Sequence, residues 1–480
     1  MAPTGAPTPL AGPAPATWRE ELAALVRLAL PLVGGNLLQM AVYAVDVMFV
    51  SRLGAVPFAA ATLGVFLLSL IMWALMGLTT ACAPLIAAEL GARSHAVREV
   101  RRSFRMALWL AAAACLFFMV VLSQGERILL LFGQDPRVAA QADGFLDILL
   151  WVMLPTVAAA VMRTVASALG RQNWAIPVTT GALAVNVLGN WLLVFGHGGF
   201  PALGLAGSAI ASVVTSVATM LAWGTILRRD GKLRRYRLFG RWWRPEWRRF
   251  REIARLGTPI ALTFTLEGAL FGGAAFLMGL ISVVAVDAHA IALNIAAVAF
   301  QIPLGIAQAA TIRVGLAYGA RDAGWIGRAG WTAIVLGTGS MFVTATAIWA
   351  APLLFVSAYV DTADPAHAAQ VALAVQFLGL AAMFQLFDGA QAVAAGVLRG
   401  VQDTRVPMIV AGVGYWIAGF GTAIWLGFYA GWAGVGIWTG LLVGLLVVSI
   451  LLIGRWSMRA RLGLLPAPLS TPAKGGVQVR

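Results

Sequence analysis

Three acidic residues lie deep within long apolar segments of the sequence: Asp46, Glu267 and Asp388. A carboxylate in the hydrocarbon region of a bilayer is costly unless it is paired, protonated or exposed to water. We expect no lysine or arginine deep in these segments that would pair with the three acids structurally. The three carboxylates are therefore the candidate sites at which a coupling cation or proton and a substrate bind.

The positions of Glu267 and Asp388 predict that the two side chains meet. Glu267 follows Leu256, at one end of its segment, by eleven residues, and Asp388 precedes Arg399 by eleven. At about 1.5 Å per residue, both lie about 16 Å from the same membrane surface. Two acids at equal depth can share a cavity, and their mutual repulsion favours uptake of H⁺ or Na⁺. Asp46 lies nearer the opposite surface.

Uncharged polar residues within the apolar segments are candidates to support the acids. Asn186 and Asn190 are one helical turn apart and could face Asp46. They could equally form hydrogen bonds that hold neighbouring helices together. The same two alternatives apply to Asn294 and Gln385.

The composition predicts the membrane helices that such buried acids require. Of 480 residues, 60% are hydrophobic and 11% are charged, whereas about 25% are charged in ordinary soluble domains. This balance excludes a soluble enzyme. Twelve apolar segments are each long enough to cross a bilayer as a helix: 24–51, 57–88, 102–123, 142–168, 174–196, 203–227, 256–284, 288–317, 325–350, 367–398, 406–428 and 432–454.

Motifs for catalysis or cofactor binding are missing from the sequence. The two cysteines and four histidines show no spacing typical of metal ligands. No phosphate-binding loop, dinucleotide fingerprint or nucleophile elbow stands in its required context. The sequence therefore predicts no catalytic residue, no cofactor and no metal site other than a possible Na⁺ site at Glu267 and Asp388.

The distribution of the net charge of +15 predicts membrane orientation and argues against nucleic acid as a partner. With the N-terminus inside, 31 of the 34 lysines and arginines fall on the inner side, so both termini are predicted to be cytoplasmic. The predicted organisation is a disordered tail (1–19), a six-helix bundle (20–227), a basic linker at the lipid surface (228–255), a second six-helix bundle (256–455) and a cytoplasmic tail (456–480).

The two halves of the sequence resemble each other at a nearly constant offset along the chain. Matching positions include Pro31 with Pro259 and Gly91-Ala92-Arg93 with Gly319-Ala320-Arg321. Each half has six segments, so both enter the membrane from the same side as parallel repeats. The predicted fold class is an all-α polytopic membrane protein of two six-helix bundles, with a cleft suited to alternating access. Pro31 and Pro259 are hinge candidates, although packing can also explain a proline in a membrane helix.

Several stretches resemble the multidrug and toxic compound extrusion (MATE) family, within its NorM-type bacterial branch. They are PLVGGNLLQMAVYAVDVMFVSRLG (31–54), LEGALFGG (266–273), DAHAIALN (287–294) and FQLFDGAQAVAAGVLRGVQDTRVP (384–407). Together with the repeat, the resemblance covers about residues 20–455.

This resemblance implies a twelve-span antiporter of the bacterial inner membrane that exports cationic amphipathic drugs or dyes in exchange for H⁺ or Na⁺. The family's acidic positions fall on Asp46, Glu267 and Asp388. Four residues before the last of these, the branch can carry tyrosine, and this chain has Phe384, which removes a hydroxyl ligand. A monomer is the expected state.

The main alternative is a lipid-linked oligosaccharide flippase or another metabolite transporter of a related fold. A flippase would favour a cationic central cavity for anionic phosphates, whereas the deep charges expected here are acidic. The apolar and aromatic surface of the expected cleft tolerates ligands of varied shape, and the carboxylates then select for positive charge.

Overall fold

The computed structural model describes residues 15–92, 96–131 and 133–467, and within them twelve helical segments are long and apolar enough to cross a membrane. In the first half these are α1 (Trp18–Val50), α2 (Ala55–Thr80) continued by α3 (Cys82–Ala92), α4 (Val97–Leu122), α6 (Pro136–Leu149) continued by α7 (Met153–Ala168), α8 (Ala175–Phe195) and α9 (Leu205–Arg229). The predicted number of membrane spans is confirmed.

The second half repeats this order with α10 (Trp247–Gly279), α11 (Val283–Gly319), α12 (Ala323–Ala350), α14 (Ala368–Gly400), an interrupted eleventh span and α17 (Ala433–Ser457). The eleventh span comprises α15 (Arg405–Gly412), the π-helix η7 (Val413–Phe420), α16 (Gly421–Ile424) and the π-helix η8 (Trp425–Tyr429). Short helices α5 (Gly125–Leu131) and α13 (Pro352–Val356) precede α6 and α14. The prediction of a continuous α-helix over 406–428 missed the π-helical turns, since apolar periodicity does not report them.

Local capping signals explain where several helices begin. The Thr17 hydroxyl accepts from the backbone N–H of Glu20 at 3.2 Å, and the Glu20 carboxylate accepts from the backbone N–H of Thr17, forming a capping box. Asp322 caps α12 in a similar way. Helix α1 therefore starts at Trp18, inside the predicted tail of 1–19. The remaining predicted tail residues 1–14 and 468–480 lie outside the described residues.

The linker between the halves is shorter than the predicted 228–255, because α9 extends to Arg229 and α10 starts at Trp247. Asp230 is the C-cap residue of α9. Burial favours its neutral acid form, but hydrogen bonds from the backbone N–H of Lys232 and the Trp174 indole, together with Arg171, lower the pKa of Asp230 below its usual value. The linker is thereby held against the loop between α7 and α8.

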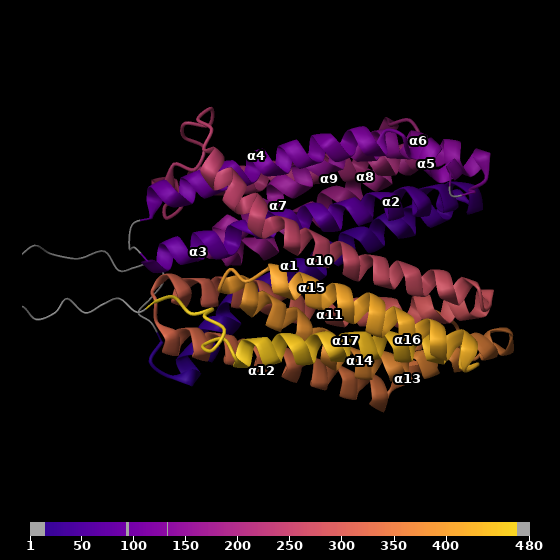
Figure 1. Ribbon diagram of the computed structural model, residues 1–480. Helices are drawn as coiled ribbons and strands as arrows, with labels where there is room; N and C mark the ends of the chain where they lie inside the picture. The colour runs from indigo at the N-terminus through magenta and orange to yellow at the C-terminus, as the bar shows by residue number, and fades with distance from the viewer. Residues whose placement is uncertain (1–14, 93–95, 132, 468–480) are drawn as a thin grey trace, which may run out of the picture.

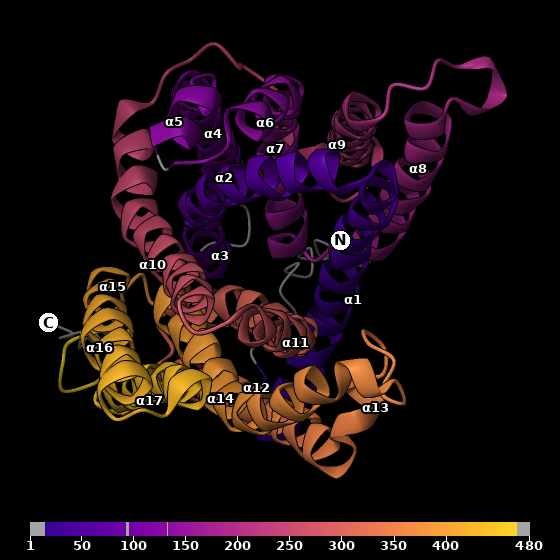
Figure 2. The same ribbon diagram turned by 90° about the vertical axis from the view of Figure 1, so that its right-hand side faces the viewer.

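Helices α1–α9 form one bundle and α10–α17 the other, with α1 and α10 crossing between them (Figures 1 and 2). Helix α1 begins and α17 ends at the same end of the molecule, which we call the terminal end; the other is the distal end (Figure 1). Many outward-facing side chains are apolar and exposed, including Phe117, Val120, Val335 and Ile417. A surface of this kind suits lipid rather than water.

Reciprocal close contacts show that the sequence repeat corresponds to a pseudo-two-fold axis. A Cβ built on Gly77 of α2 would lie 2.7 Å from Ala261 Cα of α10, and one on Gly305 of α11 would lie 3.0 Å from Val33 Cα of α1. The offset that relates Pro31 to Pro259 also relates Gly77 to Gly305 and Val33 to Ala261, so the two contacts are equivalent. Glycine is required at such points because only it lets two helix backbones approach so closely.

The same symmetry holds where α3 meets the end of α11. A Cβ on Gly91 would collide with the carbonyl group of Leu316, and a Cβ on Gly319 would collide with that of Ala88. The repeat offset again converts one pair into the other. The two bundles are therefore packed backbone to backbone at the terminal end, through equivalent segments of each half.

Candidate functional site

Asp46 projects from the distal part of α1 toward α8 and α9. Its Oδ1 accepts hydrogen bonds from Asn186 Nδ2 at 2.9 Å and Asn190 Nδ2 at 2.8 Å, and its Oδ2 accepts from Ser212 Oγ at 3.0 Å. Both asparagines are fully buried. Their predicted proximity to Asp46 is confirmed. Ser212 was missed, because serine is common in membrane helices and its spacing gives no signal of its own.

A cavity of about 730 Å³ lies beside Asp46 within the N-terminal bundle. Its wall is rich in aromatic and methionine side chains, among them Tyr43, Phe66, Met72, Trp73, Met76 and Trp223. Asp46 is the acidic side chain in this lining. The cavity can therefore hold an apolar ligand of varied shape next to one carboxylate.

Arg163 of α7 also lines this cavity, which corrects the expectation that no basic side chain reaches the buried acids. Its Nη1 donates to Asn36 Oδ1 on α1 at 3.3 Å. Arg163 lies five residues before the end of α7, and counting residues places only its Cα. The long side chain of arginine carries the charge well away from that position.

Glu267 of α10 and Asp388 of α14 are brought together, as their equal depth predicted. The amide of Gln391, also on α14, bridges them: its Nε2 donates to Glu267 Oε1 at 3.1 Å and to Asp388 Oδ1 at 3.2 Å. Tyr415 of η7 donates from its hydroxyl to Gln391 Oε1 at 3.0 Å. Asp388, Gln391 and Tyr415 are buried. We call these four residues the carboxylate pair site.

Arg399 provides a second correction, because the sequence placed it at the membrane surface. It is buried, its guanidinium carbon lies 5.3 Å from the centre of the Phe264 ring, and its charge interacts with that of Glu267. The carboxylate pair is thus partly neutralised from the terminal side. Within the described residues, no three His, Cys, Asp or Glu side chains gather closely enough to hold a metal ion.

Asn294 and Gln385 are not brought to the carboxylate pair. Asn294 is exposed and donates to the Ala290 carbonyl of its own helix at 2.9 Å. Gln385 turns toward α12, where its Oε1 accepts from Thr344 Oγ1 at 3.2 Å. Gln385 therefore fits the second alternative, a hydrogen bond between neighbouring helices, whereas Asn294 bonds to its own helix.

Pro31 and Pro259 lie inside α1 and α10, which remain helical on both sides of them. Pro31 lies two residues before Val33, which Gly305 approaches closely, and Pro259 lies two residues before Ala261, which Gly77 approaches closely. Their hinge role stays a prediction.

A buried ion pair joins the bundles at the terminal end. Glu21 of α1 is fully buried and accepts from Arg313 Nε of α11 at 2.8 Å, from Arg313 Nη2 at 2.6 Å and from Trp325 Nε1 of α12 at 2.9 Å. We call these three residues the terminal latch. At the equivalent position of α10 in the second half, Arg249 pairs with Glu89 of α3 at 3.3 Å. Nothing in the sequence indicated these pairs, since each joins two distant segments.

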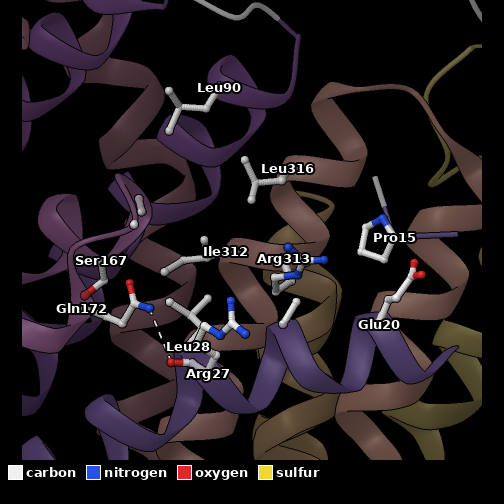
Figure 3. Close-up of a pocket in the computed structure, with 13 residues that line it drawn as sticks. Pro15, Glu20, Arg27, Leu28, Leu90, Ser167, Gln172, Ile312, Arg313 and Leu316 are labelled. Carbon is white, nitrogen blue, oxygen red and sulfur yellow. Dashed lines mark hydrogen bonds between the residues drawn. The ribbon is translucent and has the colours of Figure 1, made fainter. Parts of the chain in front are cut away.

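A cavity of about 450 Å³ lies next to the latch, between α1 and α11 (Figure 3). Arg27 and Arg313 both contribute to its wall, and Gln172 Nε2 donates to the Arg27 carbonyl at 3.4 Å (Figure 3).

Two equivalent six-helix bundles, with buried carboxylates in each and a large cavity in the first, define a polytopic membrane transporter. The MatE family model matches residues 31–192 and 259–425, one copy in each half, and the chain belongs to the MATE family. The expected family and fold are therefore confirmed, and this family consists of transporters.

The chain is similar along most of its length to curated relatives. The Probable multidrug resistance protein NorM of Mesorhizobium japonicum is 47% identical over 445 residues, which cover 93% of this chain and 95% of that protein. The Multidrug resistance protein NorM of Burkholderia vietnamiensis is 36% identical, with 95% and 97% covered.

Solved structures show the same fold at low sequence identity. A eukaryotic MATE transporter matches with a TM-score of 0.83 at 22% identity, covering 93% of this chain and 99% of that one. A MOP superfamily transporter from Pyrococcus furiosus matches with a TM-score of 0.78 at 20% identity, with 93% and 97% covered. The latter is described as having a binding pocket of reversed polarity that suggests a different function.

Proposed function

We propose that this protein is a multidrug efflux antiporter that exports cationic amphipathic compounds in exchange for H⁺ or Na⁺ by alternating access. The observation that carries the proposal is the separation of two acidic sites. Asp46 stands in a large aromatic cavity, whereas Glu267 and Asp388 form a compact, buried pair in the other bundle. The first arrangement suits an organic cation and the second suits a small ion.

The Asp46 cavity supports substrate selection by charge. A lipophilic cation offsets the cost of a buried carboxylate, and an anion would add to it. Arg163 lies in the same wall, but it is held by Asn36, whereas Asp46 faces α8 and α9. The curated relatives carry multidrug resistance in their names, which agrees with a tolerant apolar cavity.

The hydrogen bonds of Asp46 support coupling between protonation and helix packing. Asn186, Asn190 and Ser212 all donate, and an ionised carboxylate accepts without donating. A proton bound at Asp46 would compete with at least one of these donors. Protonation would therefore loosen the contact of α1 with α8 and α9, and drug and proton would compete for one carboxylate.

The proposed setting is the bacterial inner membrane, with the terminal end in the cytoplasm and the protein as a monomer. The excess of arginine at the terminal end supports this orientation. Reciprocal packing of α3 and α11 would then close the cytoplasmic side.

Transport by the purified protein in liposomes tests the proposal. An imposed pH or Na⁺ gradient should drive movement of ethidium or tetraphenylphosphonium, and Asp46→Asn, Glu267→Gln and Asp388→Asn should each abolish it in protein that remains folded. Asp147→Asn, in an exposed acid near the end of α6, is the matched control. Transport restricted to lipid-linked anionic oligosaccharides would instead establish the flippase alternative.

A further inference from the structure

We propose that Gln391 and Tyr415 make the carboxylate pair site selective for H⁺ over Na⁺. The inference rests on the proposed function, in which this pair binds the coupling ion. The coupling ion is then H⁺, and two residues outside the acidic set decide this selectivity.

The side-chain amide of Gln391 lies between the two carboxylates. Its Nε2 lies 3.1 Å from Glu267 Oε1 and 3.2 Å from Asp388 Oδ1, so an N–H group occupies the space between the two carboxylates. A cation that bridged the carboxylates would have to occupy this space. The positive end of the amide dipole therefore already stands where Na⁺ would need to bind.

The hydroxyl of Tyr415 fixes the amide in this orientation. It donates to Gln391 Oε1 at 3.0 Å, and this holds the amide oxygen on the side away from the carboxylates. Gln391 and Tyr415 are both buried, so water does not readily replace either bond. Tyr415 acts through Gln391 and is thus a positioning residue.

The π-helix η7 is what presents Tyr415 to α14. A π-helical turn holds more residues than an α-helical turn and changes which side chains face a neighbour. The turn is packed closely on α17, where Gly419 and Gly444 approach each other. An eleventh span that was α-helical throughout would present its side chains to α14 in a different order.

The carboxylate pair site supplies few oxygen ligands for a metal cation. Hard cations bind about six oxygens at roughly 2.0–2.6 Å. The site offers the two carboxylates, whereas Gln391 Oε1 is turned away. Phe384, one turn from Asp388, brings no oxygen and packs against Phe271 and Trp438 at ring distances of 6.0 and 5.7 Å. A proton needs one carboxylate oxygen and no coordination shell.

The charges around the pair are compatible with uptake of one proton. Arg399 interacts with Glu267, so the two acids and this arginine sum to one negative charge that a single proton neutralises. On α11, His289 lies against Trp438 at 5.3 Å, and Asp287 is exposed. Helix α2 has no ionisable side chain, and Arg405 of α15 is exposed. Four further arginines of the neighbouring helices are bound to other groups at the terminal end: Arg105 to Glu246, Arg313 to Glu21, Arg328 to the Pro15 carbonyl and Arg455 to Asp403.

The experiment measures ethidium transport by purified protein in liposomes, with either a pH gradient without Na⁺ or a Na⁺ gradient at equal pH. The melting temperature is also measured in NaCl against choline chloride. The wild type should respond to the pH gradient alone, and Na⁺ should not stabilise it more than choline. Transport driven by Na⁺ at equal pH, or stabilisation specific to Na⁺, would overturn the inference.

Tyr415→Phe tests the role of the positioning hydroxyl. It frees the amide to rotate and turn its oxygen toward the carboxylates, so the pH at half-maximal transport should move and NaCl should now stabilise the variant more than choline chloride does. Gln391→Leu, which removes the blocking N–H, should also shift the pH profile. Tyr429→Phe, in an exposed residue of the same span, is the control.

The outcomes separate this inference from the proposed function. Loss of transport under both gradients in the wild type would refute coupled antiport itself, whereas Na⁺-driven transport would refute only the selectivity. If Tyr415→Phe and Gln391→Leu both behaved like Tyr429→Phe, Gln391 and Tyr415 would have no part in ion selection.

Discussion

Replacing Glu21 with glutamine should open the terminal end of the transporter. Glu21 is fully buried and receives two hydrogen bonds from Arg313 and one from Trp325. The variant keeps the shape of the side chain and removes its charge. Arg313 then stays in the interface without a counterion, which favours any conformation in which water reaches it.

The size of this effect follows from the cost of breaking a buried ion pair, about 3–5 kcal/mol. The amide oxygen of glutamine can still accept a hydrogen bond from Arg313 or Trp325. We therefore take the lower limit of this cost, about 3 kcal/mol. Since about 1.4 kcal/mol corresponds to tenfold, the equilibrium between the closed and open terminal end should shift by about 10²-fold.

Cysteine accessibility measures the shift. A single cysteine at Ala87, which is fully buried where α3 meets α11, should react with a water-soluble maleimide only when the terminal end opens. The native Cys82 and Cys115 are buried and are replaced by alanine to give a clean background. Glu21→Gln should raise the labelling rate by about 10²-fold, and the exposed neighbouring change Glu20→Gln should not.

One result would refute this reasoning. If Glu21→Gln lowered the melting temperature by several degrees and left the labelling rate unchanged, the latch would be present in both conformations. It would then contribute to folding and not to closure.

Asp46→Asn should abolish proton release by purified, folded protein on addition of ethidium, because it removes the acid from the cavity lining; undiminished release would exclude Asp46 from coupling. Gly91→Ala and Gly319→Ala should each raise the labelling rate at the terminal end, and by similar factors, because they disturb symmetry-related contacts; an effect confined to one of them would contradict the two-fold axis. Because the folded-state pKa of Asp230 is lowered, its contribution to stability exists above its unfolded pKa of about 3.9 and disappears as the pH falls through the folded value. Asp230→Asn should therefore lower the melting temperature near pH 7 and have little effect below about pH 3.

The sequence was sufficient for the parts of the site that depend on depth along a helix. The rise per residue placed Glu267 and Asp388 at one level, and the structure joins them through a single amide. The spacing of Asn186 and Asn190 likewise predicted one shared face, which Asp46 meets.

Depth alone did not predict where long side chains end or which helix they face. Arg399 was placed at the surface by its Cα, but its guanidinium turns inward toward Phe264 and Glu267. Gln385 and Gln391 each lie three residues from Asp388, on opposite sides, and only the second reaches the acids. That choice depends on where α12 and α10 pack against α14, and this is a property of tertiary structure.

The reciprocal glycine contacts have a consequence for each half taken by itself. Gly77 approaches Ala261 as Gly305 approaches Val33, and Gly91 approaches Leu316 as Gly319 approaches Ala88. An interface in which both partners offer the same patch is isologous, like that of a C₂ homodimer. The two halves meet here through equivalent patches, in the arrangement that two copies of one half would have in such a dimer. A side chain added at Gly77 or at Gly305 would meet helix backbone of the other half.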